Sequence, residues 1–272
     1  MTNNTNLCTA CGTQYAPDRR LPEFCPICED DRQYIPPTGQ GWIGMDRLKE
    51  KYTVNITSLN ESLYCLKVQP DFALANRALL VNTPEGNLLW DCISLLDEQT
   101  AGFINAMGGL KAIVISHPHY YTSMNEWARE FGCPIYIHSE DRRWPVYPTG
   151  NIRFWEGHEF SLWDGIRIVH TGGHFPGSCI LHVPGMSEGG SVLCGDSLYV
   201  SRSRKHLAVM YSYPNQILLG RDEFHVFFER TADLEFDTVY GAFDNQEIKG
   251  NAMQIFRNSM LNYQRCYGLE GN

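Results

Sequence analysis

The sequence predicts a mixed α/β fold that follows a small metal-binding segment. Short apolar runs rich in β-branched residues alternate with segments of helical spacing, and turn residues join several of these runs into hairpins. This pattern is typical of mixed sheets covered by helices. Four of the ten cysteines lie in the first 28 residues, in two C-x2-C pairs. We therefore predict a four-cysteine knuckle over residues 1–36, a linker rich in proline and glycine, and an α/β domain over residues 42–272.

Length, composition and charge set the broad class of the protein. With 272 residues, of which 43 % are hydrophobic and 12 % aromatic, the chain can bury a full core. The formal net charge of −9 argues against a nucleic-acid partner. The chain opens without a signal-like segment, and no apolar run approaches the length of a membrane span. We therefore expect a cytoplasmic protein with no membrane partner, whose cysteines stay reduced.

The two C-x2-C pairs are Cys8 with Cys11 and Cys25 with Cys28. Each pair lets two thiolates face one ion, and two pairs complete a tetrahedral four-sulfur site. The pattern resembles a zinc ribbon or a rubredoxin-like knuckle, which implies structural zinc, with iron as the alternative metal. Because four thiolates leave no open coordination position, we expect the ion to fold a segment too short to build its own core. The knuckle is also a candidate docking surface for another protein.

The predicted elements of the large domain follow one another along the chain. A short helical piece occupies residues 42–52, and residues 52–68 form a strand pair. Further apolar runs predict strands at residues 78–82, 87–91, 112–115, 134–138, 166–171, 179–183, 191–195 and 238–242. Helical spacing predicts helices at residues 97–107, 123–131, 221–230 and 251–265. The remaining cysteines have apolar neighbours and are expected to pack in the core: Cys65, Cys92, Cys133, Cys179, Cys194 and Cys266.

The most informative stretch is AIVISHPHYYT, in which an apolar run ends in two histidines, His117 and His119. Two histidines separated by one residue, just past a buried strand, can turn both imidazoles toward one point, and the proline between them stiffens the turn. His174, in HTGGHFPGS, and Asp196, in LCGDS, also follow apolar runs. Imidazoles and carboxylates are donors that catalytic metal sites use.

Together with Asp91, which follows another apolar strand, these motifs resemble those of the metallo-β-lactamase superfamily over about residues 60–245. The resemblance implies an αββα sandwich of two mixed sheets, with the metal on loops at strand ends. It also implies that three histidines hold the first metal ion of the family, and that Asp91 supports the site through hydrogen bonds. Asp196 then either ligates the ion or orients the attacking water. The metal ligands implied for this ion are His117, His119, His174 and Asp196.

The sequence departs from the family at the second metal ion. The family pattern HxHxDH reads HPHYYT here, so Tyr121 stands in place of an aspartate and Thr122 in place of a histidine. Phe243 stands where the last family histidine is expected. The resemblance therefore implies at most one ion in this site, zinc or iron. Tyr120 and Tyr121 either fill the vacated pocket or, in the case of Tyr121, donate a hydrogen bond to a developing oxyanion.

These residues favour a hydrolase in which one metal ion activates water against an ester, thioester, lactone or phosphoester of a small molecule. Two alternatives stay open. One is a mononuclear non-haem iron oxygenase of thiols or persulfides, because some relatives bind iron with two histidines and an aspartate. The other is a non-catalytic binding or scaffold protein, because three second-metal ligands are replaced. A basic run at residues 201–206 is either a solvated loop or a clamp for an anionic substrate, and residues 210–214 either line the pocket or pack as a surface loop.

Overall fold

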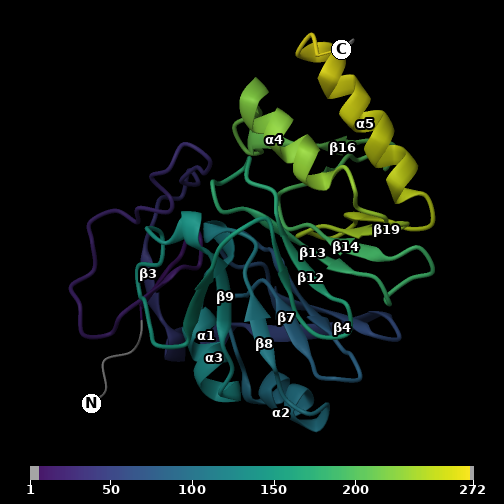
Figure 1. Cartoon of the computed structure of the whole chain (residues 1–272). Coiled ribbons are helices and arrows are strands. Elements are labelled where there is room, and N and C mark those ends of the chain that lie inside the picture. Colours follow the sequence, from purple (N-terminus) through teal and green to yellow (C-terminus); the bar gives the residue numbers. More distant parts are fainter. Residues whose placement is uncertain (1–5, 270–272) are drawn as a thin grey trace. The chain divides into compact units, whose positions relative to one another are not determined.

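The computed structural model describes residues 6–269, and the chain separates into two compact units between Trp155 and Glu156 (Figure 1). We describe each unit by itself. Among the described residues, no helix combines the length and the apolar character that a membrane span requires.

The first unit is built on a seven-stranded mixed sheet with the strand order β10-β9-β8-β7-β6-β5-β4. The strands from β4 to β7 pair antiparallel, whereas those from β7 to β10 pair parallel. The carboxyl ends of β7 and β8 therefore lie at the same edge of the sheet. The strands are β4 (Thr53–Asn60), β5 (Leu63–Gln69), β6 (Arg77–Val81), β7 (Leu88–Trp90), β8 (Ala112–Val114), β9 (Ile135–His138) and β10 (Ile152–Trp155).

Three helices accompany this sheet and lie together on one side of it in Figure 1: α1 (Met45–Lys51), α2 (Glu98–Ala106) and α3 (Met124–Phe131). Helix α2 begins after Asp97, whose side chain accepts a hydrogen bond from the backbone of Thr100. Helix α3 ends at Gly132, which adopts the left-handed conformation with φ 63°. Two short 3₁₀ turns complete the unit, η1 (Pro118–Tyr120) and η2 (Ser139–Asp141).

The cysteine-rich segment folds around a separate three-stranded sheet with the order β2-β1-β3. Its strands are only two or three residues long: β1 (Asn6–Cys8), β2 (Gln14–Tyr15) and β3 (Trp42–Gly44). The four cysteines pack with Ile27 and Tyr15, and side chains of the large domain, among them Trp144, pack against this cluster. The knuckle is therefore part of the first unit rather than a free appendage.

The second unit contains a six-stranded sheet with the order β11-β12-β13-β14-β19-β20, in which only β14 and β19 pair parallel. Its strands are β11 (Glu159–Ser161), β12 (Arg167–His170), β13 (Cys179–Val183), β14 (Ser191–Leu193), β19 (Thr238–Tyr240) and β20 (Glu247–Ile248). Two antiparallel ribbons lie outside it, formed by β15 (Tyr199–Val200) with β16 (Leu207–Ala208) and by β17 (Met210–Ser212) with β18 (Ile217–Leu218).

Helices α4 (Arg221–Thr231) and α5 (Ala252–Cys266) cover this second sheet (Figure 1). Phe224 and Phe227 of α4, with Phe256 and Met260 of α5, are fully or almost fully buried in one core with the strands. Burying side chains of this size stabilises the unit by roughly 1.5–3 kcal/mol each, before the entropy of ordering them is subtracted.

The mixed α/β class predicted from the sequence is confirmed, and each predicted helix and strand has a counterpart within a few residues. One expectation is wrong. Cys266 is expected in the core but lies exposed at the last position of α5, beyond the buried residues of that helix, the last of which is Met260. The other five scattered cysteines are buried as predicted. The division at residues 36–42 stays a prediction.

Candidate metal centres

His117 and His119 follow β8 at the carboxyl edge of the first sheet. His117 is extended, with φ −169° and ψ 172°, and the 3₁₀ turn that begins at Pro118 brings His119 back beside it. The centroids of the two imidazole rings lie 5.0 Å apart, and each residue is 2 % exposed. The local sequence therefore produces the buried pair of imidazoles that its spacing predicts.

Asp91, at the end of neighbouring β7, holds the backbone that precedes this pair. Its carboxylate Oδ1 accepts a 2.7 Å hydrogen bond from the backbone N–H of Ser116. The Ser116 hydroxyl lies 2.8 Å from Nδ1 of His117. Because Nδ1 is engaged in this way, Nε2 is the nitrogen that His117 presents to a ligand. Asp91 itself has φ 61°, an uncommon conformation for a residue other than glycine.

Aromatic and hydroxyl side chains occupy the segment in which the resemblance implies further metal ligands. Tyr120 and Tyr121 are 0 % and 2 % exposed, and the Tyr120 ring packs edge-on against His117 at a centroid distance of 4.5 Å. Thr122 is also buried and adopts φ 34°. Neutral phenol and alcohol groups are poor substitutes for a carboxylate and an imidazole as ligands of a divalent cation.

In the second unit, His174 lies on the glycine-rich loop between β12 and β13. Gly172 and Gly173 adopt φ 65° and 83°, which turns the loop sharply before the histidine. The Nδ1–H of His174 donates a 2.8 Å hydrogen bond to the carbonyl oxygen of Tyr211, so Nε2 is again left as the ligand atom. That Nε2 lies 4.0 Å from Oδ2 of Asp196, which follows β14. This distance is too long for a hydrogen bond and allows both atoms to bind one ion.

His170 braces the same loop. Its Nε2–H donates a 2.7 Å hydrogen bond to the carbonyl oxygen of Pro176, and the Arg230 guanidinium from α4 lies 3.2 Å from its Nδ1. His170 therefore fixes loop geometry, in agreement with the interpretation of this residue as neighbouring structure.

Phe243 follows β19 in the second unit and is half-buried. It lines an open hollow of about 640 Å³ together with the basic run, whose Arg202 and Arg204 are exposed. The solvated-loop interpretation of this run therefore agrees with its exposure. That Phe243 and Tyr121 jointly fill the place of a second ion stays a prediction.

The four knuckle cysteines converge as the sequence predicts. Their sulfur atoms all lie within 4.8 Å of one another, with 3.6 Å between Cys8 and Cys28 and 3.7 Å between Cys11 and Cys25. These distances exclude disulfides, in which sulfurs are about 2.05 Å apart. They match the separation of about 3.8 Å expected for four sulfurs at about 2.3 Å from a tetrahedral zinc ion. The donor set therefore fits a thiophilic metal ion.

The surroundings of this cluster favour a thiolate at Cys25, whereas the hydrogen bond with Cys25, together with burial, raises the pKa of Cys11. Hydrogen bonds from the other thiols, with Cys11 the largest contributor, lower the pKa of Cys25. The Tyr15 hydroxyl adds a 3.1 Å hydrogen bond to the same sulfur. Cys11 donates in turn to the Thr13 hydroxyl at 3.1 Å. Such outer hydrogen bonds orient metal ligands and tune their basicity.

Several residues that contact the candidate ligands were not identified from the sequence. Ser116 immediately precedes the histidine pair, so its position could have indicated a partner for His117. Tyr211 supplies only a backbone carbonyl to His174, and a main-chain acceptor has no signature in the sequence. The ring centroid of Tyr213 lies 5.7 Å from that of His174, so residues 210–214 contact a candidate ligand, and their role in lining a pocket stays a prediction.

Comparison with known proteins identifies a relative of this chain by sequence. No protein-family model matches the sequence. A Bacillus subtilis (strain 168) protein, the uncharacterized protein YmaE, is 38 % identical over 267 residues, which cover 97 % of each chain.

Solved structures match at lower identity. The DIM-1 metallo-β-lactamase superposes with a TM-score of 0.56 at 13 % identity, over 81 % of this chain and 100 % of its own. FIM-1 from Pseudomonas aeruginosa, in its mono-zinc form, gives 0.54 at 15 % identity over 79 % and 96 %. The di-zinc class B3 enzyme LRA-12 from an Alaskan soil metagenome gives 0.51 at 15 % identity over 80 % and 94 %. The chain therefore belongs to the family of B. subtilis YmaE and has the metallo-β-lactamase fold, preceded by a four-cysteine cluster.

Proposed function

We propose that the protein is a hydrolase that works with a single metal ion held by His117, His119, His174 and Asp196. The observation that carries this proposal is that neighbouring oxygen atoms orient two of the three histidine rings. His117 and His174 have Nδ1 engaged by a neighbouring oxygen, and both therefore offer Nε2. Three imidazoles and one carboxylate form a donor set that suits zinc or iron.

One ion rather than two follows from the replaced ligands. Tyr121, Thr122 and Phe243 stand where the resemblance implies an aspartate and two histidines. FIM-1, which has the same fold, has been described in a mono-zinc form. A single ion in this fold is therefore chemically reasonable, and the substrate would be a small ester, thioester, lactone or phosphoester.

Two side chains of the protein, Asp196 and Tyr121, have proposed roles in the reaction. A divalent ion held by these residues would lower the pKa of a bound water molecule to about 7 and would polarise a carbonyl or phosphoryl oxygen. Asp196 either binds the ion or accepts a hydrogen bond from the attacking water. Tyr121 can donate a hydrogen bond through its phenol to a developing oxyanion.

Metal analysis combined with a hydrolysis panel tests this function. We expect two metal ions per chain in the native protein, one with sulfur ligands and one with nitrogen and oxygen ligands by X-ray absorption. His117→Ala and His174→Ala should each lose the second ion and the hydrolytic activity, while the sulfur-bound ion stays. His225→Ala, which alters an exposed histidine on α4, is the matched control and should retain both ions.

Two outcomes would count against the proposal. If wild type and His117→Ala hydrolyse the panel equally, the activity does not depend on this site. If metal-replete wild type binds only the sulfur-ligated ion, the non-catalytic binding protein becomes the better interpretation.

A further inference from the structure

The knuckle turn, residues 11–14, touches both loops that hold the His117/His119 pair. We propose that this turn is a positioning element for the two histidines, so that loss of the metal from the four-cysteine site loosens them. The inference deepens the proposed function, but it is argued from contacts within the first unit only.

The first contact joins the knuckle to the segment after His119. The backbone N–H of Gln14 donates a 3.0 Å hydrogen bond to the carbonyl oxygen of Thr122. The Gln14 side-chain Nε2 donates a 2.9 Å bond to Oε1 of Glu126 on α3. Gln14 is 2 % exposed, whereas the Glu126 side chain is 24 % exposed, so the second bond is only partly shielded from water. The turn therefore holds the far end of the histidine loop at two points.

The second contact reaches the loop that follows β7. Gly12 adopts φ 78°, and a Cβ atom at this position would lie 2.1 Å from the Ser94 hydroxyl oxygen. Only glycine allows so close an approach in that conformation. Ser94 is three residues beyond Asp91, whose carboxylate holds Ser116 and through it His117. The turn therefore also packs on the loop that orients the first histidine.

The two loops are tied to each other beneath the turn. The carbonyl oxygen of Ile93 accepts hydrogen bonds from the Ser123 hydroxyl at 2.9 Å and from the indole N–H of Trp127 at 3.3 Å. A displacement of either loop is thus transmitted to the other. The knuckle turn contacts both of these loops, one through Gln14 and the other through Gly12.

The conformation of the turn depends on the cysteines. The Gly12 N–H donates to the carbonyl oxygen of Cys8 at 2.8 Å, and the Cys8 N–H donates to that of Thr13 at 3.0 Å. Strand β2, which continues the turn, has only two residues. A segment this small draws most of its folding free energy from its metal ion. Release of the ion should therefore free Gln14 and Gly12 from the histidine loops.

Amide hydrogen exchange tests the coupling without using activity. Removing the sulfur-bound metal by chelation from His174→Ala, the variant expected to lack the second ion, should increase exchange of the backbone amides of residues 116–124 about tenfold or more, as expected when a buried hydrogen bond is lost. Amides of β5 and β6 in the same unit should not respond. Unchanged exchange in residues 116–124 after verified metal loss would overturn the proposal.

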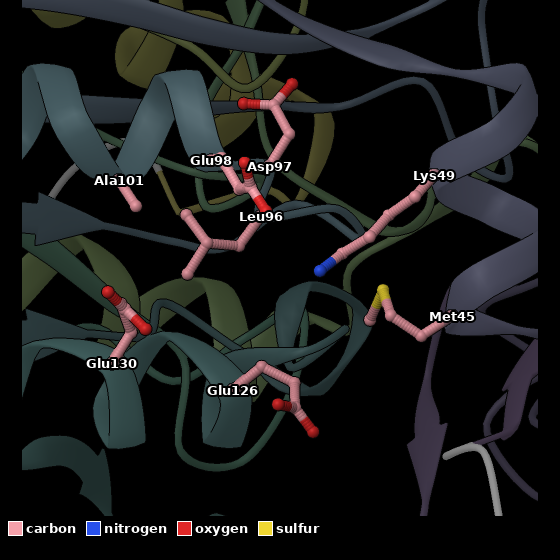
Figure 2. Close-up of a pocket in the computed structure, with 8 residues that line it drawn as sticks. All are labelled: Met45, Lys49, Leu96, Asp97, Glu98, Ala101, Glu126 and Glu130. Carbon is pink, nitrogen blue, oxygen red and sulfur yellow. The ribbon is translucent and has the colours of Figure 1, made fainter.

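Variants separate the contact from general unfolding of the knuckle. Glu126→Ala should increase exchange in the same segment with all four thiolates still metal-bound, whereas Glu126→Gln keeps an acceptor for Gln14 and should restore protection. Glu130→Ala is the matched control, because Glu130 is exposed one turn further along α3 and lines the same pocket of about 150 Å³ (Figure 2). An equal response in Glu130→Ala, or none in Glu126→Ala, would contradict the coupling.

A parallel titration with Co²⁺ distinguishes this inference from the proposed function. Its thiolate charge-transfer bands report the knuckle, and weaker ligand-field bands report a nitrogen and oxygen site. If wild type shows only the thiolate bands while exchange still responds to metal loss, the single-metal hydrolase fails and the positioning role stands. If both sites bind Co²⁺ and Glu126→Ala leaves the affinity of the histidine site unchanged within twofold, the positioning role fails.

Discussion

Asp91 illustrates how one carboxylate can orient a candidate metal ligand that it does not touch. It accepts the N–H of Ser116, and the Ser116 hydroxyl then engages Nδ1 of His117. The residue is 1 % exposed and keeps a left-handed backbone conformation, which costs of order 1–3 kcal/mol in a residue other than glycine. The contacts of the buried Asp91 therefore have to offset the free-energy cost of this backbone conformation.

Replacing Asp91 tests this arrangement. Asp91→Ala leaves the buried N–H of Ser116 without its acceptor, so the free energy of unfolding should fall by about 1–3 kcal/mol. Metal affinity at the histidine site should fall as well, by about 10- to 100-fold. Asp91→Asn keeps an acceptor oxygen and should lose much less of either. Denaturant unfolding and metal titration measure both effects; similar losses in the two variants would show that charge, rather than the hydrogen bond, matters.

His182 predicts a pH dependence in the second unit. Its Nε2–H donates to the carbonyl oxygen of Glu235 at 2.8 Å, and the Arg167 guanidinium lies 3.3 Å from Nδ1. Burial, and secondarily the charge of Arg167, lower the pKa of His182. Because the unfolded chain then binds the proton more tightly, this contribution to stability is complete above about pH 6.5 and is lost as the pH falls toward the folded-state pKa. Urea unfolding at pH 5.0 and 7.5 should show a smaller pH dependence in His182→Asn than in wild type.

The candidate metal ligands could be predicted from the sequence. The groups that orient their side chains could not. The ligand candidates are titratable side chains in recognisable spacing. The His174 ring is oriented by a hydrogen bond to the backbone carbonyl of Tyr211, and any residue can supply that oxygen. The cysteine cluster is predictable for the opposite reason, because all of its donors are side chains of one residue type.

At the scale of elements, the knuckle turn is the unusual feature. It joins β1 to β2 and presents Gly12 to the loop after β7. Neither strand is long enough to be stable by itself. The turn is therefore maintained by the sulfur site on one side and by its contacts with the sheet on the other.

A side chain at Gly12 should break this contact. Gly12→Ala places Cβ 2.1 Å from the Ser94 hydroxyl oxygen and adds the strain of a left-handed alanine, so we expect a loss of about 1–3 kcal/mol in stability. Combining it with Ser94→Gly removes the clash but not the backbone strain and should recover part of the loss. Guanidinium unfolding measures this. Gly150→Ala, where no atom lies within 4 Å of the added Cβ, is the control.

Element prediction succeeded where local signals agree. Asp97 and Gly132 lie at the ends of α2 and α3, as capping chemistry requires. The two ribbons β15–β16 and β17–β18 could not be predicted, because strands of two or three residues carry no measurable alternation. Their pairing is decided by packing against the second core instead.

At the scale of the whole molecule, the chain combines a metallo-β-lactamase fold with a sequence that departs from the motifs of the resemblance at three positions. The fold is shared with enzymes only 13–15 % identical, so it survives almost complete replacement of the sequence. Fold class could therefore be predicted from the order of strands and motifs. The number of ions that the site binds stays a prediction, because it depends on a few positions whose roles rest on the resemblance alone.

Restoring those positions should restore a second ion. The triple variant Tyr121→Asp, Thr122→His, Phe243→His returns the carboxylate and imidazoles that the family pattern contains. We expect the metal content to rise from two ions per chain to three, measured by mass spectrometry of the native protein and by elemental analysis. Each single replacement should leave it at two. A folded triple variant that still binds two ions would show that these three positions do not face a common site.

The exposed cysteine at the end of α5 has a practical consequence. Nine of the ten thiols are buried, and four of those are committed to the knuckle cluster, whereas Cys266 is open to solvent. A maleimide fluorophore added briefly at neutral pH should therefore attach at one position only. Such a labelled chain would allow binding or tumbling to be followed by fluorescence anisotropy, with no engineered tag and with both candidate metal centres intact.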